Sequence, residues 1–188
     1  DFMLTQKGTK TLYTKRLVLR RFTMEDVQPM FDTWANDPRV TRFLTWEPHG
    51  TPEVTGQLMA QWCADYEKPD NYNWAMELDG RLIGSIGVVR LDERSRRADL
   101  GYCMAYDCWN HGLMPEACRA VIDYLFGEVG FHRLCICHAV KNPASGRVAQ
   151  KCGLTYEGTM REFEWSPRDG FLDIAYYSIL RQEWEKQN

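Results

Sequence analysis

The stretch that decides the fold is LGYCMAYDCWNHGLMPEA, which occupies residues 100–117. It begins as an apolar strand, turns, and opens an amphipathic helix at Pro115 and Glu116, with Gly112 permitting a tight backbone approach. The first amides of a helix have no intrahelical partner and lie at the positive end of its dipole, so this junction predicts a phosphate site. An ordinary strand-to-helix loop explains the same residues, and the stretch matches neither GxxxxGK[ST] nor GxGxxG.

A second strand-to-helix junction is HAVKNPASGRVAQKCGL, residues 138–154. Asn142 and Pro143 mark a turn and a helix start, and Gly153 marks the helix end. The pattern therefore places Ser145 and Arg147 on a helix. Helix capping and a solvent-exposed helix face explain the same residues without any binding role.

Hydrophobic periodicity predicts the other elements. Strands are expected at 12–22, 72–78, 82–91, 99–105, 134–140, 154–158 and 171–180, and helices at 24–35, 52–68, 115–129 and 143–151. Strands with two late helices, each entered directly from a strand, indicate an α+β or mixed α/β sheet. No repeat or linker interrupts the pattern, so residues 1–188 are read as a single domain.

Composition excludes several classes of function. The 23 Lys and Arg are outnumbered by 26 Asp and Glu, a formal net charge of −3, so the basic excess of a nucleic-acid or anionic-bilayer binder is absent. No apolar stretch reaches the roughly 18 residues that span a membrane. The N-terminus also lacks the apolar core of a secretory signal. We therefore expect a cytoplasmic protein without nucleic-acid or membrane partners.

The seven cysteines and four histidines show no metal-ligand spacing, and no CxxC pair occurs. Buried thiols of a reducing compartment are the simplest interpretation of the cysteines. No metal site is expected.

An ordered set of short motifs carries a family resemblance. They are TKRLVLRRF (14–22), NDPRV (36–40), IG (83–84), LGY (100–102), NPAS (142–145), CGLTYEG (152–158) and YSILRQEW (177–184). Nearly end to end, the chain resembles the GNAT superfamily of acetyl-CoA-dependent N-acetyltransferases. It is most similar to the branch of ribosomal-protein N-terminal (RimJ/RimL-like) acetyltransferases. The resemblance implies a twisted, mixed sheet of six or seven strands flanked by about four helices.

The resemblance also implies acetyl-CoA as cosubstrate and assigns residues to it. Tyr102, Cys103 and Met104 would follow the pantetheine arm on a strand that splays from its neighbour. Asn142 would bind the pantetheine region near the second helix, and Arg147 is also assigned to cofactor binding. The pyrophosphate loop would comprise Trp109, Asn110, His111, Gly112, Leu113 and Met114. Only Gly112 matches the family pattern at a defining position, and Met114 stands where a small residue is usual.

For catalysis, the resemblance implies direct attack of a neutral amine on the thioester. The amine must lose a proton, the oxyanion needs an N–H donor, and the departing thiolate needs a proton or a hydrogen bond. Ser145 matches the serine of the ribosomal branch as proton donor, and the tyrosine of other branches falls at Ala149. The Met104 N–H suits the oxyanion. Glu164 matches the proposed base; Glu162 is the second choice, because it would point the same way on a regular strand.

The sequence is compatible with several acceptors. A protein or peptide N-terminus, a small-molecule amine such as an antibiotic or polyamine, and a catalytically inactive CoA-binding or interaction module are the alternatives, and relatives often form homodimers. Helices 24–35 and 52–68 and segment 158–171 would shape the acceptor site. Tryptophans suit an acceptor groove or the core, and core packing is expected for at least two of Trp34, Trp46, Trp62 and Trp74.

Overall fold

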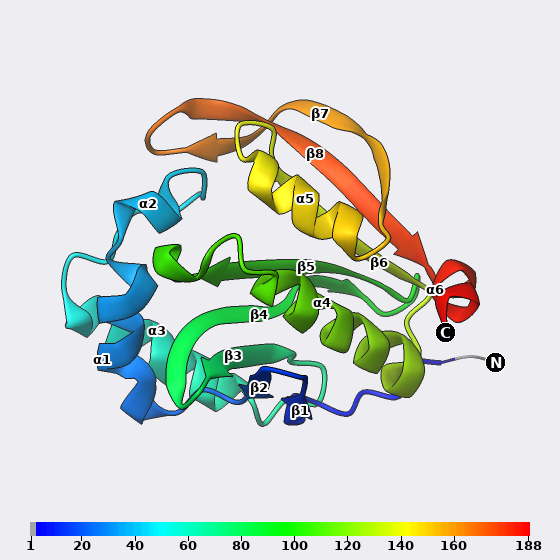
Figure 1. Cartoon of the computed structure of the whole chain (residues 1–188), viewed down its shortest axis with the longest axis horizontal. Coiled ribbons are helices and arrows are strands. Elements are labelled where there is room, and N and C mark those ends of the chain that lie inside the picture. Colours follow the sequence, from blue (N-terminus) through cyan, green and yellow to red (C-terminus); the bar gives the residue numbers. More distant parts are fainter. Residues whose placement is uncertain (1–2) are drawn as a thin grey trace.

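The computed structural model describes residues 3–188, which form a layered α/β structure around one twisted sheet (Figure 1). Over this range the sheet has eight strands in the order β1-β2-β3-β4-β5-β6-β8-β7. The strands are β1 (Leu12–Tyr13), β2 (Leu17–Arg20), β3 (Asn73–Leu78), β4 (Arg81–Asp92), β5 (Arg97–Met104), β6 (Arg133–Ala139), β7 (Thr155–Ser166) and β8 (Gly170–Leu180). Neighbouring strands are antiparallel except β5 and β6.

Helical segments cover both faces of the sheet. They are η1 (Met24–Asp26), α1 (Val27–Met30), η2 (Phe31–Ala35), α2 (Pro38–Thr41), α3 (Pro52–Asp65), η3 (Tyr106–Cys108), α4 (Leu113–Tyr124), η4 (Leu125–Val129), α5 (Pro143–Lys151) and α6 (Arg181–Gln187). The segments η1, α1 and η2 follow one another without a break, as the expected helix 24–35 requires.

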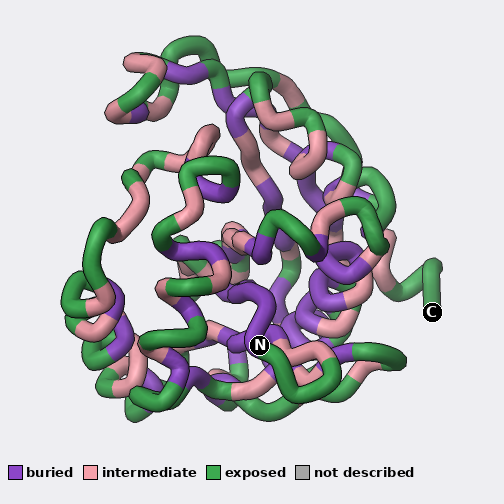
Figure 2. The backbone as a smooth tube through the Cα atoms, turned by 60° about the vertical axis from the view of Figure 1, so that its left-hand side comes forward, coloured by how far each residue is buried: buried purple, intermediate pink, exposed green. Residues whose placement is uncertain are grey.

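A hydrophobic core lies on each side of the sheet. Trp74 and Met76 pack into a cluster with α4, whereas Ala75 between them packs into a second cluster with Met30 and Met59 from the helices of the opposite face. This alternation follows from the period of a strand, whose successive side chains point to opposite faces. The buried segments accordingly lie inside the molecule and the connecting loops outside (Figure 2).

The parallel pairing of β5 with β6 stops halfway along both strands. It runs from Arg97 opposite Arg133 to Leu100 opposite Ile136 and goes no further. β5 nevertheless continues to Met104, where it pairs only with β4, and β6 continues to Ala139 against β8. We call this opening, between residues 101–104 and 137–139, the β5–β6 fork.

The predicted fold class is confirmed, with one strand more than expected. The expected strand 12–22 is two strands, because the Leu17 N–H donates to Thr14 Oγ1 at 3.0 Å and turns the chain between them. The expected strand 154–158 continues as β7 to Ser166. This edge strand is mostly exposed and its pairing with β8 shifts twice, so its apolar residues do not alternate regularly.

The helices α2 and α6 were not expected from the sequence. They have 4 and 7 residues, too few for a periodic pattern. Local caps hold them instead: Asp37 accepts the Arg39 N–H at 2.9 Å, and Glu183 accepts the Leu180 N–H at 2.9 Å. Among residues 3–188, no helix has the length and apolar character needed to cross a bilayer.

Gly84 is expected to be essential for the close approach of β4 and β5 beside the fork. A Cβ at this position would lie 2.5 Å from the Cys103 carbonyl oxygen and 3.1 Å from the Met104 Cα, and neither backbone atom can move aside. We expect Gly84→Ala to lower the free energy of unfolding by about 2 kcal/mol in urea titrations. The control is Gly56→Ala in α3, where a Cβ would meet only Val27 Cγ1 at 3.8 Å. It should be neutral or stabilise by up to about 1 kcal/mol. Equal destabilisation by both substitutions would contradict this account.

Candidate functional site

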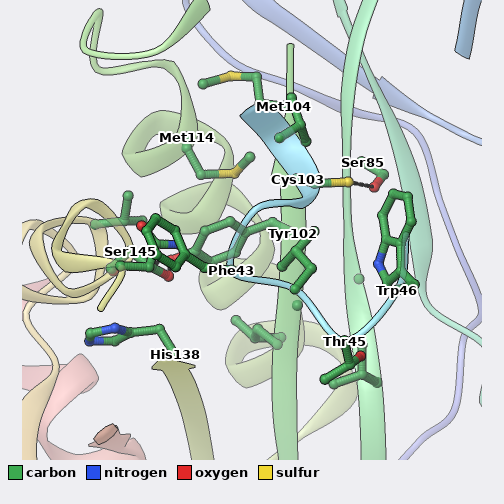
Figure 3. A pocket seen from close by; sticks show the side chains of 18 of the residues that line it. Phe43, Thr45, Trp46, Ser85, Tyr102, Cys103, Met104, Met114, His138 and Ser145 are labelled. Atoms are coloured by element: carbon green, nitrogen blue, oxygen red, sulfur yellow. Dashed lines mark hydrogen bonds between the residues drawn. The ribbon is translucent and has the colours of Figure 1, made fainter. Parts of the chain in front are cut away.

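A cavity of about 1090 Å³ adjoins the β5–β6 fork (Figure 3). One part of it lies between the fork and the first turns of α4 and α5. The other part lies beneath residues 43–49, α3 and the end of β7 that carries Glu164. The cavity therefore joins the two predicted strand-to-helix junctions to a second region formed by distant segments of the chain.

Free backbone amides line the approach to α4. The N–H groups of residues 110–114 donate no hydrogen bond within the described part of the chain. Asn110 and Gly112 adopt left-handed backbone conformations, with φ of 66° and 74°, and turn the chain into the helix. Several unpaired amides beside a helix N-terminus form an anion site, so the residues present fit a phosphate-bearing ligand.

A charged cluster fixes the first turn of α4 to the turn between β1 and β2. Glu116 accepts hydrogen bonds from the Thr14 hydroxyl at 2.6 Å, the Arg16 N–H at 2.9 Å and the Arg16 side chain at 2.9 Å. Arg16 also donates to the His111 carbonyl at 3.0 Å. Glu116 thus positions the Arg16 guanidinium beside the free amides, where its remaining N–H groups can donate to a phosphate.

The unusual residue Met114 leaves the loop intact. Its side chain packs into the larger core cluster and also lines the cavity, and its N–H stays unpaired. Trp109 is anchored by its indole N–H, which donates to the Met104 carbonyl at 2.9 Å. The longer side chain at position 114 therefore leaves the loop amides unpaired.

Tyr102 and Ser145 meet across the fork, their hydroxyl oxygens 2.8 Å apart (Figure 3). Tyr102 belongs to β5 and Ser145 to the first turn of α5. Burial raises the pKa of the Tyr102 phenol, despite the hydrogen bond to Ser145. Tyr102 was predicted only as a neighbour of the pantetheine arm, and the contact of its hydroxyl was not foreseen.

Cys103 is unsuited to act as a nucleophile. Burial raises the pKa of its thiol to about 11, and its Sγ lies 3.3 Å from Ser85 Oγ. The thiolate is the reactive form of cysteine, so this environment favours a mechanism without an acyl-cysteine.

Glu164 and Glu162 face different surroundings, which corrects the expectation that they point the same way. Glu164 lines the cavity and lies 3.3 Å from Arg90, which also approaches Asp99 at 3.7 Å. Glu162 has a φ of 46° and lines a separate recess of β7 and β8. The strand is irregular here, with the pairing shifted between Met160 and Glu164.

The cavity gathers most of the sequence-predicted site residues. Those that line it are Tyr102, Cys103, Met104, Trp109, Asn110, Gly112, Leu113, Met114, Asn142, Ser145, Arg147 and Glu164, whereas the His111 side chain is exposed outside the lining. Trp34 and Trp74 are buried in the core, and Trp46 and Trp62 line the cavity, as expected for at least two core tryptophans. Across residues 3–188, no three His, Cys, Asp or Glu side chains form a metal-binding group.

The segment 43–49 is the part of the site that the sequence did not predict. All seven of its residues line the cavity, including Phe43, Trp46 and His49. The segment has no hydrophobic period and no regular secondary structure. Trp46, one of the four tryptophans considered for a groove, was the only signal available.

Comparison with known proteins agrees with this geometry. The acetyltransferase (GNAT) domain family matches residues 16–155. The uncharacterized N-acetyltransferase YoaA of Bacillus subtilis (strain 168) is 30% identical over 90% of this chain and 96% of its own length. The ribosomal-protein-serine acetyltransferase of Escherichia coli (strain K12) is 27% identical over 54% of this chain and 56% of its own.

The fold is also that of solved acetyltransferases. The microcin C7 self-immunity acetyltransferase MccE, solved in complex with acetyl-CoA and AMP, superposes with a TM-score of 0.80 at 19% identity, covering 96% of this chain and 99% of that one. The forked sheet, the free amides and the adjoining cavity define a coenzyme A-dependent acyltransferase. The chain belongs to the GNAT family of N-acetyltransferases and uses acetyl-CoA.

Glu116 is expected to give the protein a pH-dependent increment of stability. Burial raises the pKa of this carboxyl, but the hydrogen bonds from Thr14 and Arg16 outweigh it and bring the pKa below the ordinary 4.5. A pKa lowered by folding stabilises the protein above the unfolded-state pKa, and this contribution is lost as the pH falls through the folded-state pKa. We expect Glu116→Gln to cost about 1–2 kcal/mol of unfolding free energy at pH 7.

Chemical denaturation across the acid range tests this expectation. The difference in unfolding free energy between Glu116→Gln and the unsubstituted protein should shrink toward zero as the pH falls and Glu116 becomes protonated. The exposed Glu25, which makes no hydrogen bond in the described residues, provides the control Glu25→Gln. A Glu116→Gln cost that stays constant from neutral to acidic pH would contradict the assignment.

Proposed function

We propose that this chain transfers the acetyl group of acetyl-CoA to the primary amine at the N-terminus of a protein or peptide, by direct attack in a ternary complex. The observation that carries the proposal is the continuity of the cavity, from the free amides of α4 past the fork to the region under residues 43–49. The relative from Escherichia coli, whose name states a ribosomal-protein acceptor, supports a protein N-terminus.

The residues at the fork supply the groups that the transfer needs. The amides of residues 110–114, with Arg16, would hold the phosphates, and the unpaired edge of β5 would hold the amide-containing arm. Ser145 would donate to the departing sulfur and the Met104 N–H to the oxyanion. Acetyl-CoA supplies an activated thioester, so the protein's task is to orient the amine and manage its proton.

A small-molecule amine is the second candidate, and one feature of the cavity is equally compatible with it. Trp46 and Trp62 line the cavity together with the acidic residues Glu47 and Asp65, of which Asp65 is paired with Lys68 at 3.2 Å. Aromatic faces and carboxylates attract a compact cation as well as they attract a peptide α-ammonium group. The inactive-module alternative rested on Met114, whose burial leaves the loop amides free.

An acceptor comparison tests the proposal. Thiol release from acetyl-CoA is measured with a peptide bearing a free N-terminal serine, the same peptide with a blocked N-terminus and an internal lysine, spermidine, and an aminoglycoside. We expect the highest kcat/KM for the free N-terminus and loss of turnover on blocking. A higher kcat/KM for spermidine or the aminoglycoside would establish the second candidate, and CoA binding without any turnover would overturn both.

Glu164 is expected to assist deprotonation of the acceptor. Removing its negative charge with Glu164→Gln keeps the shape of the side chain and should lower kcat/KM by about 10² at neutral pH. The difference in kcat/KM between Glu164→Gln and the unsubstituted protein should become smaller at high pH, where the amine is already neutral. The matched control is Glu162→Gln, outside the cavity lining. An unchanged kcat/KM for Glu164→Gln at neutral pH would remove this residue from the mechanism.

A further inference from the structure

The contact between Tyr102 and Ser145 determines where the serine hydrogen can point. The Tyr102 hydroxyl lies 2.8 Å from Ser145 Oγ and 3.2 Å from the Ser145 carbonyl oxygen. A phenol has one hydrogen, so it donates either to the serine hydroxyl or to the carbonyl. If it donates to the carbonyl, the serine hydrogen is drawn toward Tyr102. If it donates to Oγ, the serine hydrogen is free.

The position of Ser145 in the helix favours the second arrangement. In α5, which runs from Pro143 to Lys151, the Ser145 carbonyl is aligned to accept the N–H of Ala149, four residues later. The Ser145 hydroxyl has no other hydrogen-bond partner among the described residues. The distance from the Tyr102 hydroxyl to Ser145 Oγ, 2.8 Å, is also shorter than its 3.2 Å distance to the Ser145 carbonyl oxygen.

Tyr102 is held as a neutral donor. Burial raises the pKa of its phenol well above the ordinary range, so the group keeps its hydrogen across the physiological range and does not serve as a base. Its ring comes from β5 beyond the last β5–β6 pair, Leu100 opposite Ile136, where the fork gives it room to reach α5. The tyrosine therefore offers a fixed hydrogen bond to a serine that lines the cavity.

We propose that Tyr102 is a positioning residue: its O–H donates to Ser145 Oγ and leaves the serine hydrogen free to point into the cavity, toward the sulfur of bound coenzyme A. The inference rests on the proposed role of Ser145. No proton leaves Tyr102, which acts only by fixing the direction of the neighbouring hydroxyl. The transfer balances without it, because the amine loses one proton and the sulfur gains one.

The ionisation of the bound coenzyme A thiol tests the inference without any acceptor. Ultraviolet absorbance of the thiolate is titrated against pH in binary complexes with the unsubstituted protein, Tyr102→Phe, Ser145→Ala and the double variant. A hydrogen bond donated to a thiolate lowers its pKa, so each single variant should raise the pKa of the bound thiol, by about 1 for Ser145→Ala. Adding Tyr102→Phe to Ser145→Ala should change nothing further.

Turnover and a matched control complete the test. Tyr102→Phe should lower kcat about tenfold with KM for acetyl-CoA within about twofold, because the ring is kept and only the orientation of Ser145 is lost. Tyr124→Phe is the control: it removes a buried hydroxyl that donates to the Gly8 carbonyl at 2.7 Å, outside the cavity lining. It should change neither the thiol pKa nor kcat.

The outcomes separate the role of Tyr102 from the acetyltransferase activity itself. A Tyr102→Phe protein that matches the Tyr124→Phe control in thiol pKa, or an effect of Tyr102→Phe that persists in full without Ser145, would overturn the inference. Coenzyme A binding without acetyl transfer by the unsubstituted protein would overturn the proposed function. The pKa of the bound thiol would then still test whether Tyr102 positions Ser145. Absence of coenzyme A binding would overturn both.

Discussion

The end of the β5–β6 pairing at Leu100 and Ile136 is the constraint on which the rest of the site depends. Beyond it, β5 pairs with no described strand except β4, so its other edge is unpaired by any strand and only the Met104 carbonyl there is taken, by the Trp109 indole N–H. Both strands then lead into helices, and the fork brings the first turns of α4 and α5 to a single cavity. An unpaired strand edge and unpaired helix amides are costly in a core but useful beside a ligand that can bond to them.

Three contacts fix the elements that surround the fork. Gly84 keeps β4 close to β5 where β6 no longer supports it. Glu116 and Arg16 attach α4 to the turn before β2, so the phosphate end is fixed by charge-assisted hydrogen bonds. Tyr102 bridges the fork to α5 through Ser145. These contacts therefore fix β5, the first turn of α4 and the first turn of α5 around the fork.

The sequence predicted what depends on periodicity and on local chain geometry. Gly112, Pro115, Asn142 and Pro143 identified both strand-to-helix junctions, and most of the residues assigned there line one cavity. Three features depend on tertiary contacts and were not predictable. The segment 43–49 has no period, the shift in β7 between Met160 and Glu164 sends Glu162 elsewhere, and the Tyr102–Ser145 contact joins residues 43 positions apart.

The most direct test of the central claim is calorimetric titration of the purified protein with acetyl-CoA, CoA and ATP. Acetyl-CoA and CoA can engage both the loop amides and the edge of β5 that no strand pairs, so both should bind with micromolar affinity, about −8 kcal/mol. ATP, which has phosphates but no pantetheine arm, should bind at least tenfold more weakly. Absence of binding by acetyl-CoA and CoA, or equal binding by ATP, would contradict the claim that the β5–β6 fork is the coenzyme site.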